Sequence, residues 1–372
     1  MGVDIKSLIK EYAPDAISRL SYSDCYGQTW AVDASIFCYK FCYDGYTSKN
    51  KKPPPNPHIR GFYQMIKTFL SFGIKLIIVF DGSTPPQKQG TVDKRKADRA
   101  NKKAQLELMR STGAPEADIK KLESQIISFP DTTYTDIIHL CQLFNVPTLR
   151  ANFEADALCI KLQQLGIVQG IVSNDCDILM FGGQRFLHNY DYSNEIDCID
   201  FNKLLASMKL THDEFISMCI LCGTDYTDNT LTGIGKSRAY KLVQSLSSSF
   251  NVNGNVNGNV IDIIEQKQQI DFTVLIYQSA FDYVKTAPDN ENLDDINSKL
   301  SYETIAIDIK WDEINTLMMS KCNCMKSTIP KHKLEVIAGL SPRTKEITCD
   351  SSNTIIVPKF HIKLKFPLTT SQ

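Results

Sequence analysis

Two apolar runs that each carry an aspartate near their end constrain the fold of this chain more than any other feature. They are Thr29–Ser35 (TWAVDAS) and Lys75–Gly82 (KLIIVFDG). Unbroken apolar runs of this kind are typical of strands that are buried on both faces, as in parallel sheets. A β-branched run at Ile167–Val172 and a short one at Val146–Leu149 extend the pattern. These runs predict an α/β fold whose central, mostly parallel sheet is flanked by helices.

Acidic residues gather where these strands end. Within Ala151–Gly182, one acid pair precedes an amphipathic helical segment and a second pair follows the β-branched run. In open α/β sheets, ligands bind at the carboxyl ends of the strands. Clustered carboxylates repel one another unless cations neutralise them, and hard oxygen donors suit magnesium or manganese. The candidate ligands of one shared metal site are Asp33, Asp81, Glu154, Asp156, Asp175, Asp177 and Asp225.

Each acid also has a simpler interpretation. A single Asp-x-Asp is more often a solvated acidic turn than a metal site, because short motifs are weak evidence. Asp33 fits equally well as the N-cap of a helix over Ile36–Cys42. Only the convergence of several acids on one place favours the metal site.

A basic segment follows the strand that ends in Asp81. Arg95, Arg99 and Lys102 are spaced four and three residues apart, which gives a helix over Lys88–Arg110 a cationic stripe. Such a helix would bring positive charge beside the acids, as phosphodiester chemistry requires. The alternative is a solvated helix with local acidic partners. The mixed-charge segment after it, Ser111–Ser128, contains a Gly-Ala-Pro break and indicates a separate hairpin or cap.

A glycine-bearing turn at Leu231–Ala239 (LTGIGKSRA) opens another predicted helix. A nucleotide-binding P-loop would need glycine where Thr230 stands, so that interpretation fails. A turn between two helices, whose free backbone N–H groups meet a DNA phosphate, fits better. A plain helix–helix turn is the alternative.

Composition and net charge limit the partners, the compartment and the cysteine chemistry that we expect for this chain. The net charge of −1 gives no global signature of nucleic-acid binding, so any basic surface must be local. Twelve scattered cysteines and the lack of a signal peptide or membrane-spanning run predict an intracellular protein with reduced thiols. Cys219 with Cys222 and Cys322 with Cys324 suggest a zinc site. The first pair lies in the apolar helical run Phe215–Leu221, which favours core packing, and the second has no matching partner pair, so structural zinc is disfavoured.

Two segments interrupt the predicted elements. Residues 44–58 are polar and rich in lysine and proline, which predicts a surface loop whose aromatic neighbours could hold single-stranded nucleic acid. Residues 247–260 repeat asparagine, glycine and valine, which predicts a flexible insertion. Beyond about residue 271 the sequence indicates helical and strand-like fragments without recognisable chemistry.

In their order along the chain, these motifs resemble the flap endonuclease and XPG-type five-prime nuclease superfamily. The matching pieces are MGVDIKSLI, AVDAS, IIVFDG, PPQKQG followed by KR, FEADA, SNDCDIL, CGTDY and GIGKSRA. They cover about the first 245 residues and are specific in combination. The resemblance implies a PIN-like sheet with a helical arch or cap and a helix–two-turn–helix element that grips DNA. The asparagine-rich insertion and the compressed C-terminus are typical of a divergent, for example viral, member.

The resemblance also implies roles for single residues. The seven acids would bind two Mg²⁺ ions, for which Mn²⁺ can substitute, with Asp81 and Asp175 counted as catalytic. Lys88 and Arg95 would be the catalytic basic pair. A potassium ion is expected at the helix–two-turn–helix. The expected DNA contacts are Gly2, Tyr39, Arg99, Lys102, Lys103, Gly233, Gly235, Lys236 and Ser237.

We therefore expect a structure-specific DNA nuclease that cleaves near single-strand to duplex junctions with a five-prime end, by a two-metal mechanism, in replication, repair or recombination. The alternatives are a catalytically silent junction-binding scaffold and another acid-cluster hydrolase, namely a phosphatase or a ribonuclease. The phosphatase is disfavoured because Asp33 is followed by Ala34-Ser35 without a second aspartate.

The expected partner is DNA with a flap, nick or junction. We expect the protein to bind it as a monomer and not to associate with a membrane. The compartment would be the nucleus or, for a viral member, a cytoplasmic replication site. Two residues depart from the family: Asp156 replaces a glutamate and Asn174 replaces an acid. The chain also lacks a C-terminal clamp-binding motif, which argues against sliding-clamp binding.

The expected organisation has five parts. An N-terminal nuclease region with the basic arch helix covers residues 1–110, and the arch or cap covers 111–130. An internal nuclease region with the helix–two-turn–helix covers 131–245. The insertion covers 246–260, and a C-terminal region without an assigned role covers 261–372.

Overall fold

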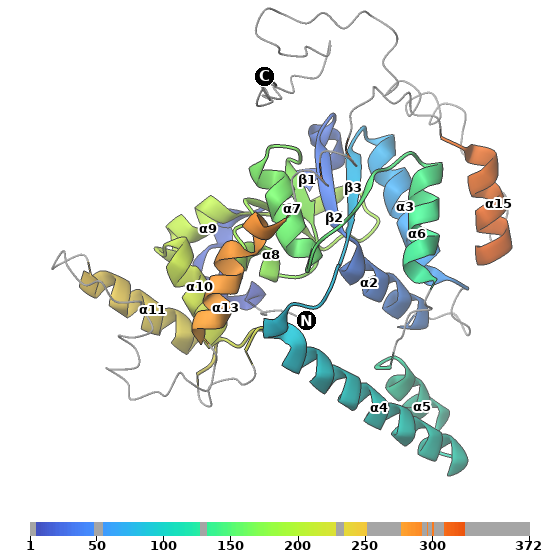
Figure 1. Ribbon diagram of the computed structural model, residues 1–372, viewed down its shortest axis with the longest axis horizontal. Helices are drawn as coiled ribbons and strands as arrows, with labels where there is room; N and C mark the ends of the chain where they lie inside the picture. The colour runs from blue at the N-terminus through green and yellow to red at the C-terminus, as the bar shows by residue number, and fades with distance from the viewer. Residues whose placement is uncertain are drawn as a thin grey trace, which may run out of the picture.

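A single sheet organises the part of the chain that the structure describes. The structure is a computed structural model that describes residues 5–47, 55–126, 132–227, 234–250, 277–291, 296, 300 and 309–323. Within these residues, seven strands form one sheet in the order β1-β7-β6-β5-β2-β3-β4. Figure 1 shows the sheet, with β1, β2 and β3 labelled, between α7 and the helices α3 and α6. The strands are β1 Ile17–Ser21, β2 Thr29–Asp33, β3 Lys75–Phe80, β4 Thr148–Arg150, β5 Gly170–Val172, β6 Arg185–His188 and β7 Glu195–Asp200.

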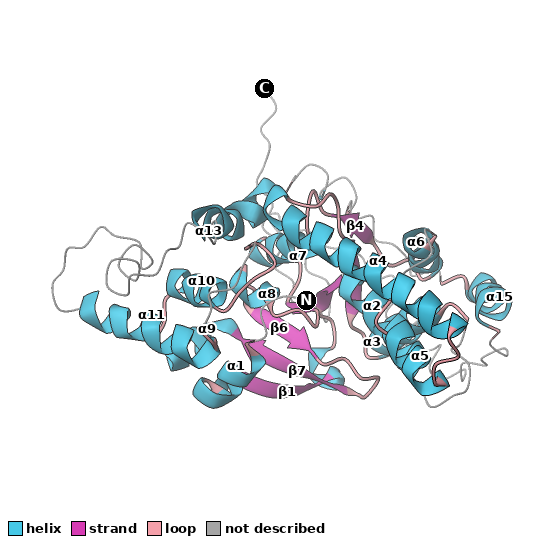
Figure 2. Ribbon diagram, turned by 90° about the horizontal axis from the view of Figure 1, so that it is seen from below, coloured by secondary structure: helices cyan, strands magenta, loops and turns pink. Residues whose placement is uncertain are grey.

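The five strands from β6 to β4 run parallel, which confirms the predicted mostly parallel sheet. Strands β7 and β1 add antiparallel pairs at the other edge, beside α1 and α9 (Figure 2). β5 is shorter than the predicted run because Ile167 and Val168 both donate their backbone N–H to Leu162 O and so close the preceding helix. The predicted strand at Thr29–Ser35 ends at Asp33 because α2 begins at the next residue.

Helices cover both faces of the sheet. They are α1 Lys6–Tyr12, α2 Ala34–Thr47, α3 Pro57–Ser71, α4 Gln89–Ser111, α5 Glu116–Glu123, α6 Thr133–Leu143, α7 Ala155–Gln164, α8 Asp177–Met180, α9 Phe201–Met208, α10 His212–Leu221, α11 Lys236–Phe250, α13 Tyr277–Thr286 and α15 Trp311–Cys322. Strand β3 contributes side chains to the apolar clusters on both faces of the sheet, because successive side chains of a strand point to opposite faces. Ile77 and Val79 join one apolar cluster with α1, α7 to α10 and α13. Leu76, Ile78 and Phe80 join the other with α2, α3, α6 and α15.

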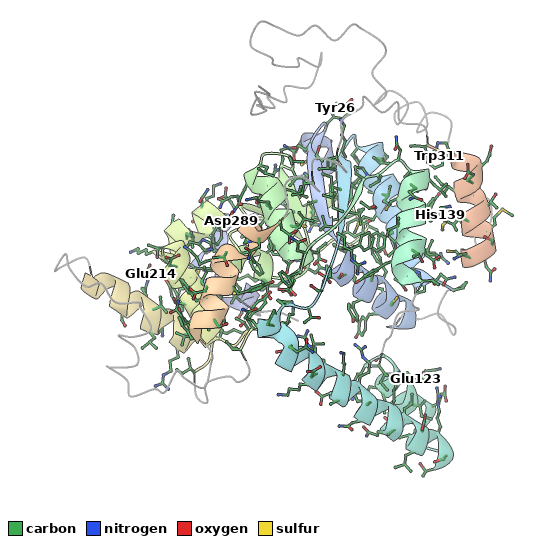
Figure 3. The ribbon with its side chains drawn as sticks, in the orientation of Figure 1. Tyr26, Glu123, His139, Glu214, Asp289 and Trp311 are labelled. Carbon is green, nitrogen blue, oxygen red and sulfur yellow. The ribbon has the colours of Figure 1, made fainter. Side chains whose placement is uncertain are left out.

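The helix α15 closes the second layer from the C-terminal part of the chain. Its first residue, Trp311, packs with its ring centroid 5.6 Å from that of Phe144 (Figure 3). Near its end, Lys321 pairs with the buried carboxylate of Asp136 on α6. A segment for which the sequence indicated no role therefore packs against helices α3 and α6 of this layer.

The helices α4 and α5 extend away from the sheet as a separate arm (Figure 1). Leu106 is the buried residue of α4, and it packs with Ile119, Leu122 and Ile126 in a small cluster of their own. Arg110 pairs with Glu123 across the hairpin. The helix predicted over Lys88–Arg110 is thereby confirmed, with bounds Gln89–Ser111. In its described residues, the segment after it supplies one helix, α5, which folds back on α4 and forms the hairpin with it, and the role of this arm as an arch or cap stays a prediction.

Two predicted loops begin later than expected. α2 continues to Thr47 and α11 to Phe250, so the first residues of segments 44–58 and 247–260 are helical. Extending an existing helix costs far less than nucleating one, which explains why polar residues follow the apolar part of each helix. The remainder of both segments lies largely outside the described residues. So do Gly2, Gly233, Cys324 and the C-terminal tail.

No helix in the described ranges combines the length and apolar character that a membrane span requires.

Candidate metal centre and active site

Four neighbouring parallel strands bring six of the predicted acids to one edge of the sheet. Because β5, β2, β3 and β4 run in the same direction, their carboxyl ends lie side by side. The acids there are Asp33 at the end of β2, Asp81 after β3, Glu154 and Asp156 after β4, and Asp175 and Asp177 after β5. The strand order therefore places six of the seven acids at the same end of neighbouring strands, while their role as ligands of one metal site stays a prediction.

The seventh acid, Asp225, comes from the turn after α10 and meets the basic helix. Its Oδ1 accepts a hydrogen bond from Arg95 Nη2 at 2.6 Å, and its Oδ2 lies 3.7 Å from Lys88 Nζ. Burial alone would raise the pKa of Asp225, but nearby positive charges, those of Lys88 and Arg95 among them, lower it. The base of α4 therefore delivers both predicted cations to the acid cluster.

Asp33 has two structural roles at once. Its Oδ1 accepts the backbone N–H groups of Ser35 at 3.1 Å and Ile36 at 3.3 Å, so it does cap α2. Its Oδ2 accepts the hydroxyl of Ser173 at 3.0 Å, which ties it to the end of β5. Burial and the charge of Asp81 raise the pKa of Asp33 to about 7. The capping role and membership of the acid cluster are compatible.

Asp156 is the acid whose surroundings favour a bound cation most directly. It is 9% exposed, and within the described ranges its Oδ1 has no hydrogen-bond partner. Burial and the charges of Asp33 and Asp175 raise the pKa of Asp156 well above its usual range. A buried, unpaired carboxylate is costly unless a cation or a proton neutralises it. The all-oxygen donor set and this unpartnered oxygen together fit a hard divalent ion.

In the described part of the chain, the acidic side chains stand too far apart to coordinate one ion. Among the described side chains, no three His, Cys, Asp or Glu residues converge closely enough to hold a single metal. Beside burial, the charges of Asp81 and Asp175 nevertheless raise the pKa of Asp33, and those of Asp33 and Asp175 raise the pKa of Asp156, so these acids lie within electrostatic reach. The assignment of individual ligands stays a prediction.

Glu154 is held by three hydrogen-bond donors. Lys88 Nζ donates to Oε1, while the hydroxyls of Tyr226 and Tyr283 donate to Oε2 at 2.6 Å and 3.2 Å. Burial and Glu154 raise the pKa of both tyrosines, so both hydroxyls stay protonated. Burial alone would lower the pKa of Lys88, but the charge of Glu154 raises it instead. The Lys88 ammonium also lies 5.4 Å from the centroid of the Tyr226 ring.

The predicted DNA contacts are distributed over three helices. Tyr39 on α2 is 43% exposed. Arg99 and Lys102 are partly exposed and Lys103 is exposed on α4. Gly235 precedes α11, whose first turn holds Lys236 and Ser237. Among the residues that the structure describes, a Cβ added at Gly235 would meet nothing within 4 Å.

The cysteines support the core interpretation. Cys219 and Cys322 are buried in the two apolar clusters, and neither forms a disulfide. Cys222 is partly buried against the first cluster.

Sequence reasoning missed the two tyrosines that hold Glu154. Tyr226 directly follows Asp225 in the CGTDY motif, so its neighbourhood was a usable signal. Tyr283 stands beyond the asparagine-rich segment in a stretch without a recognisable motif, and only the fold brings it back to Glu154.

Comparison with known proteins agrees with this geometry. Residues 1–102 match the XPG N-terminal domain and residues 145–225 match the XPG I-region. Flap endonuclease 1-B of Physcomitrium patens is 33% identical over 258 residues, which cover 67% of this chain and 73% of that protein. Flap endonuclease 1 of Theileria parva is 35% identical over 264 residues, and the match spans only about half, 53%, of its length.

Solved structures with a similar fold include a catalytic core bound to DNA. The catalytic core of Rad2 in complex with DNA substrate superposes with a TM-score of 0.62 at 21% identity, covering 90% of this chain and 99% of that one. This likeness supports the predicted PIN-like nuclease fold. By its domains and its sequence similarity, the chain belongs to the flap endonuclease and XPG family.

Proposed function

We propose that this protein is a metal-dependent DNA nuclease that hydrolyses phosphodiester bonds near single-strand to duplex junctions with a five-prime end. It would act in replication, repair or recombination. The observation that carries the proposal is the buried acid cluster, with the unpartnered oxygen of Asp156, directly beside the cations of Lys88 and Arg95. Family membership supports the same conclusion.

The seven predicted acids would hold the metal, with Asp81 and Asp175 at the reacting phosphate. Two Mg²⁺ ions, or Mn²⁺ in their place, supply charge stabilisation and an activated water when they are bound. The predominance of carboxylate donors at the site favours these hard ions over softer metals.

Lys88 and Arg95 would bind and orient the phosphate that is cut. In the absence of DNA their charges pair with Glu154 and Asp225, so they are already fixed beside the acids. A preorganised cation needs little rearrangement when negative charge develops on the phosphate, which is the physical basis of electrostatic catalysis. Loss of either cation should therefore slow the chemical step.

The choice of substrate would be structural. Arg99, Lys102 and Lys103 on α4, together with Gly235, Lys236 and Ser237 at α11, offer contacts for phosphates, which fix position without reading bases. Tyr39 on α2 would stack on an unpaired base near the site. DNA with a flap, nick or junction presents both kinds of contact at once. The roles of Gly2, Gly233 and a potassium ion fall outside the described residues and stay predictions.

The direct test is cleavage of end-labelled DNA by the full chain. A five-prime flap, a nicked duplex, a Holliday junction and a plain duplex are incubated with Mg²⁺ and, in parallel, with EDTA. We expect metal-dependent product from the flap and little from the plain duplex.

Variants define which residues are responsible. Asp175→Asn should abolish cleavage and retain binding of the flap in EDTA. Asp24→Asn is the matched control, because Asp24 is an exposed acid ahead of the amino end of β2, at the opposite end of the strand from the cluster. Tight junction binding without any product from the wild type would instead identify a silent scaffold. Equal cleavage of an RNA flap would favour a ribonuclease.

A further inference from the structure

The segment 277–291, which consists of α13 and the short helix Ala287–Asn290, contacts the candidate site in several places. We call it the strap. Its Tyr283 is 7% exposed and donates its hydroxyl to Glu154 Oε2, next to the hydroxyl of Tyr226 on the same oxygen. The two tyrosine rings lie with centroids 5.3 Å apart. One end of the Glu154 carboxylate is therefore enclosed by a residue that lies more than 50 positions beyond the matched XPG I-region, which ends at residue 225.

The strap also holds the loop that leads to Glu154. The backbone N–H of Asn152 donates to Glu291 Oε2 at 3.1 Å, and its side-chain amide donates to Asn290 O at 2.8 Å. On the far side of this loop, Lys161 of α7 pairs with Asp289 at 3.0 Å. The strap is thus tied to the backbone before Glu154 at Asn152 and to a side chain of the helix after it at Lys161.

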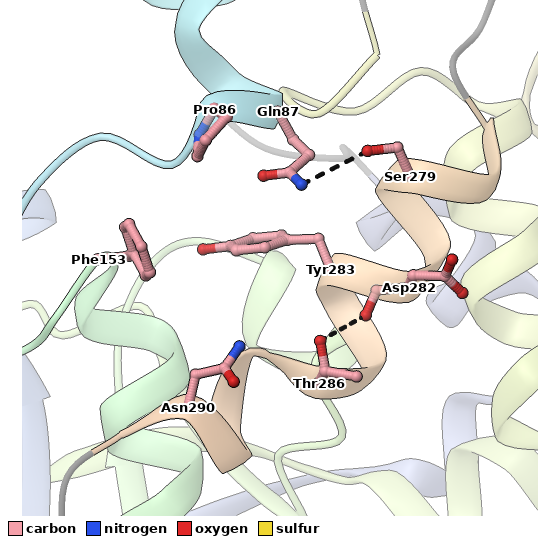
Figure 4. A pocket seen from close by; sticks show the side chains of 8 residues that line it. All are labelled: Pro86, Gln87, Phe153, Ser279, Asp282, Tyr283, Thr286 and Asn290. Atoms are coloured by element: carbon pink, nitrogen blue, oxygen red, sulfur yellow. Dashed lines mark hydrogen bonds between the residues drawn. The ribbon is translucent and has the colours of Figure 1, made fainter.

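A third contact reaches the turn that carries Lys88. Gln87 Nε2 donates to Ser279 Oγ at 3.4 Å (Figure 4). Between this contact and the Glu154 loop lies a cavity of about 550 Å³, with Phe153 on one side and the Tyr283 ring projecting into it. The strap therefore touches both partners of the Lys88–Glu154 ion pair through their neighbours in the sequence.

We propose that the strap is part of the active site and that Tyr283 is a positioning residue for Glu154. The inference rests on the proposed nuclease function and extends it to the C-terminal region. With Tyr226, Tyr283 fixes Oε2, so that Oε1 faces Lys88 and the carboxylate presents one orientation to a metal. Hydrogen bonds to a ligand from outside the coordination shell fix its orientation, and their loss typically costs 10–100-fold in metal affinity or activity.

The test uses two tyrosines of the same helix. Tyr283→Phe removes only the hydroxyl that bonds Glu154. Tyr277→Phe is the matched control, because Tyr277 is also buried on α13 but bonds the hydroxyl of Ser217 at 2.7 Å, away from the acids. For each full-length variant, Mn²⁺ binding is measured by isothermal titration calorimetry without DNA. Single-turnover cleavage of a five-prime flap, flap affinity in EDTA and the melting temperature are measured alongside.

We expect Tyr283→Phe to weaken Mn²⁺ binding about tenfold and to slow single-turnover cleavage by a similar factor. Flap affinity in EDTA should be unchanged, and Tyr277→Phe should match the wild type in Mn²⁺ binding and cleavage rate. Equal behaviour of the two variants would overturn the positioning role while leaving the nuclease proposal intact. If the wild type cuts no substrate but Tyr283→Phe still weakens Mn²⁺ binding, the nuclease proposal fails and the positioning of Glu154 stands.

Discussion

Replacing Asp156 by asparagine should make the metal-free protein more stable while it destroys metal binding. Asp156 is 9% exposed, its Oδ1 has no hydrogen-bond partner among the described residues, and its neighbours are other acids. The amide has nearly the same size, carries no charge, and can donate hydrogen bonds to carboxylates that now repel it. We therefore predict that the charge of Asp156 lowers the stability of the metal-free protein, while metal binding requires that charge.

The magnitude follows from the burial of an unpaired polar group, which costs roughly 1–3 kcal/mol in mutational data. In EDTA at pH 7, we expect Asp156→Asn to gain about 1–2 kcal/mol in the free energy of unfolding. For a chain of this size that gain corresponds to an increase of roughly 1–3 °C in melting temperature, from about 2.1 cal/mol/K of unfolding entropy per residue. In saturating Mn²⁺ the order should reverse, because a ligand at 100 times its dissociation constant stabilises the wild type by about 2.7 kcal/mol.

The assay is thermal unfolding followed by circular dichroism, in EDTA and across a Mn²⁺ titration. Asp136→Asn is the matched control: Asp136 is also 9% exposed, but it pairs with Lys321 and lies in a different part of the fold. Removing its charge leaves that lysine unpaired, so this variant should be less stable in EDTA and should keep the metal response. The reasoning is refuted if Asp156→Asn is destabilised in EDTA as Asp136→Asn is, or if Mn²⁺ leaves the wild-type melting temperature unchanged.

Three further predictions concern the basic and glycine-bearing elements. Arg95→Ala should slow single-turnover cleavage about 100-fold while flap affinity falls far less, since Arg95 is already fixed on Asp225 at 2.6 Å; equal losses in rate and affinity would argue against a catalytic role. The double variant Arg99→Ala with Lys102→Ala should weaken binding of all DNA forms alike. It should also reduce the slope of log affinity against log salt by about 0.9 for each phosphate that is no longer neutralised. Filter binding at several salt concentrations measures both effects. Gly235→Ala should keep the wild-type melting temperature, because a Cβ there meets no atom of the described residues within 4 Å, yet weaken duplex binding; unchanged affinity would leave the turn without a DNA role.

The central sheet could be predicted because its strands are buried on both faces. All the residues of β3 after Lys75 are buried, and such a run leaves no alternation to misinterpret. The acids at its ends followed from the same pattern, since parallel neighbours place their carboxyl ends together. Sequence order alone was sufficient for Asp33, Asp81 and Asp175 because each stands at or just after its strand.

The antiparallel edge could not be predicted in the same way. β1 is only partly buried along its length, and polar contacts support it, such as those of Arg19 with Glu195 at 3.0 Å and Asp197 at 2.7 Å. These partners are more than 170 residues away in the sequence, so no local pattern announces them. The strap was missed for a related reason: Tyr283 has no motif around it, and its role arises only from contact with Glu154.

Asp33 both caps α2 and belongs to the acid cluster, so replacing it is a poor way to make an inactive protein for binding studies. Its carboxylate secures the first turn of α2, the helix that carries Tyr39, so an alanine there removes an N-cap worth about 1 kcal/mol and loosens a surface expected to touch the substrate. A loss of affinity in Asp33→Ala would then have two causes that no titration can separate. Asp156, with one oxygen that has no hydrogen-bond partner in the described part of the chain, is therefore the position at which we expect an asparagine to remove the proposed catalysis with little disturbance to the fold.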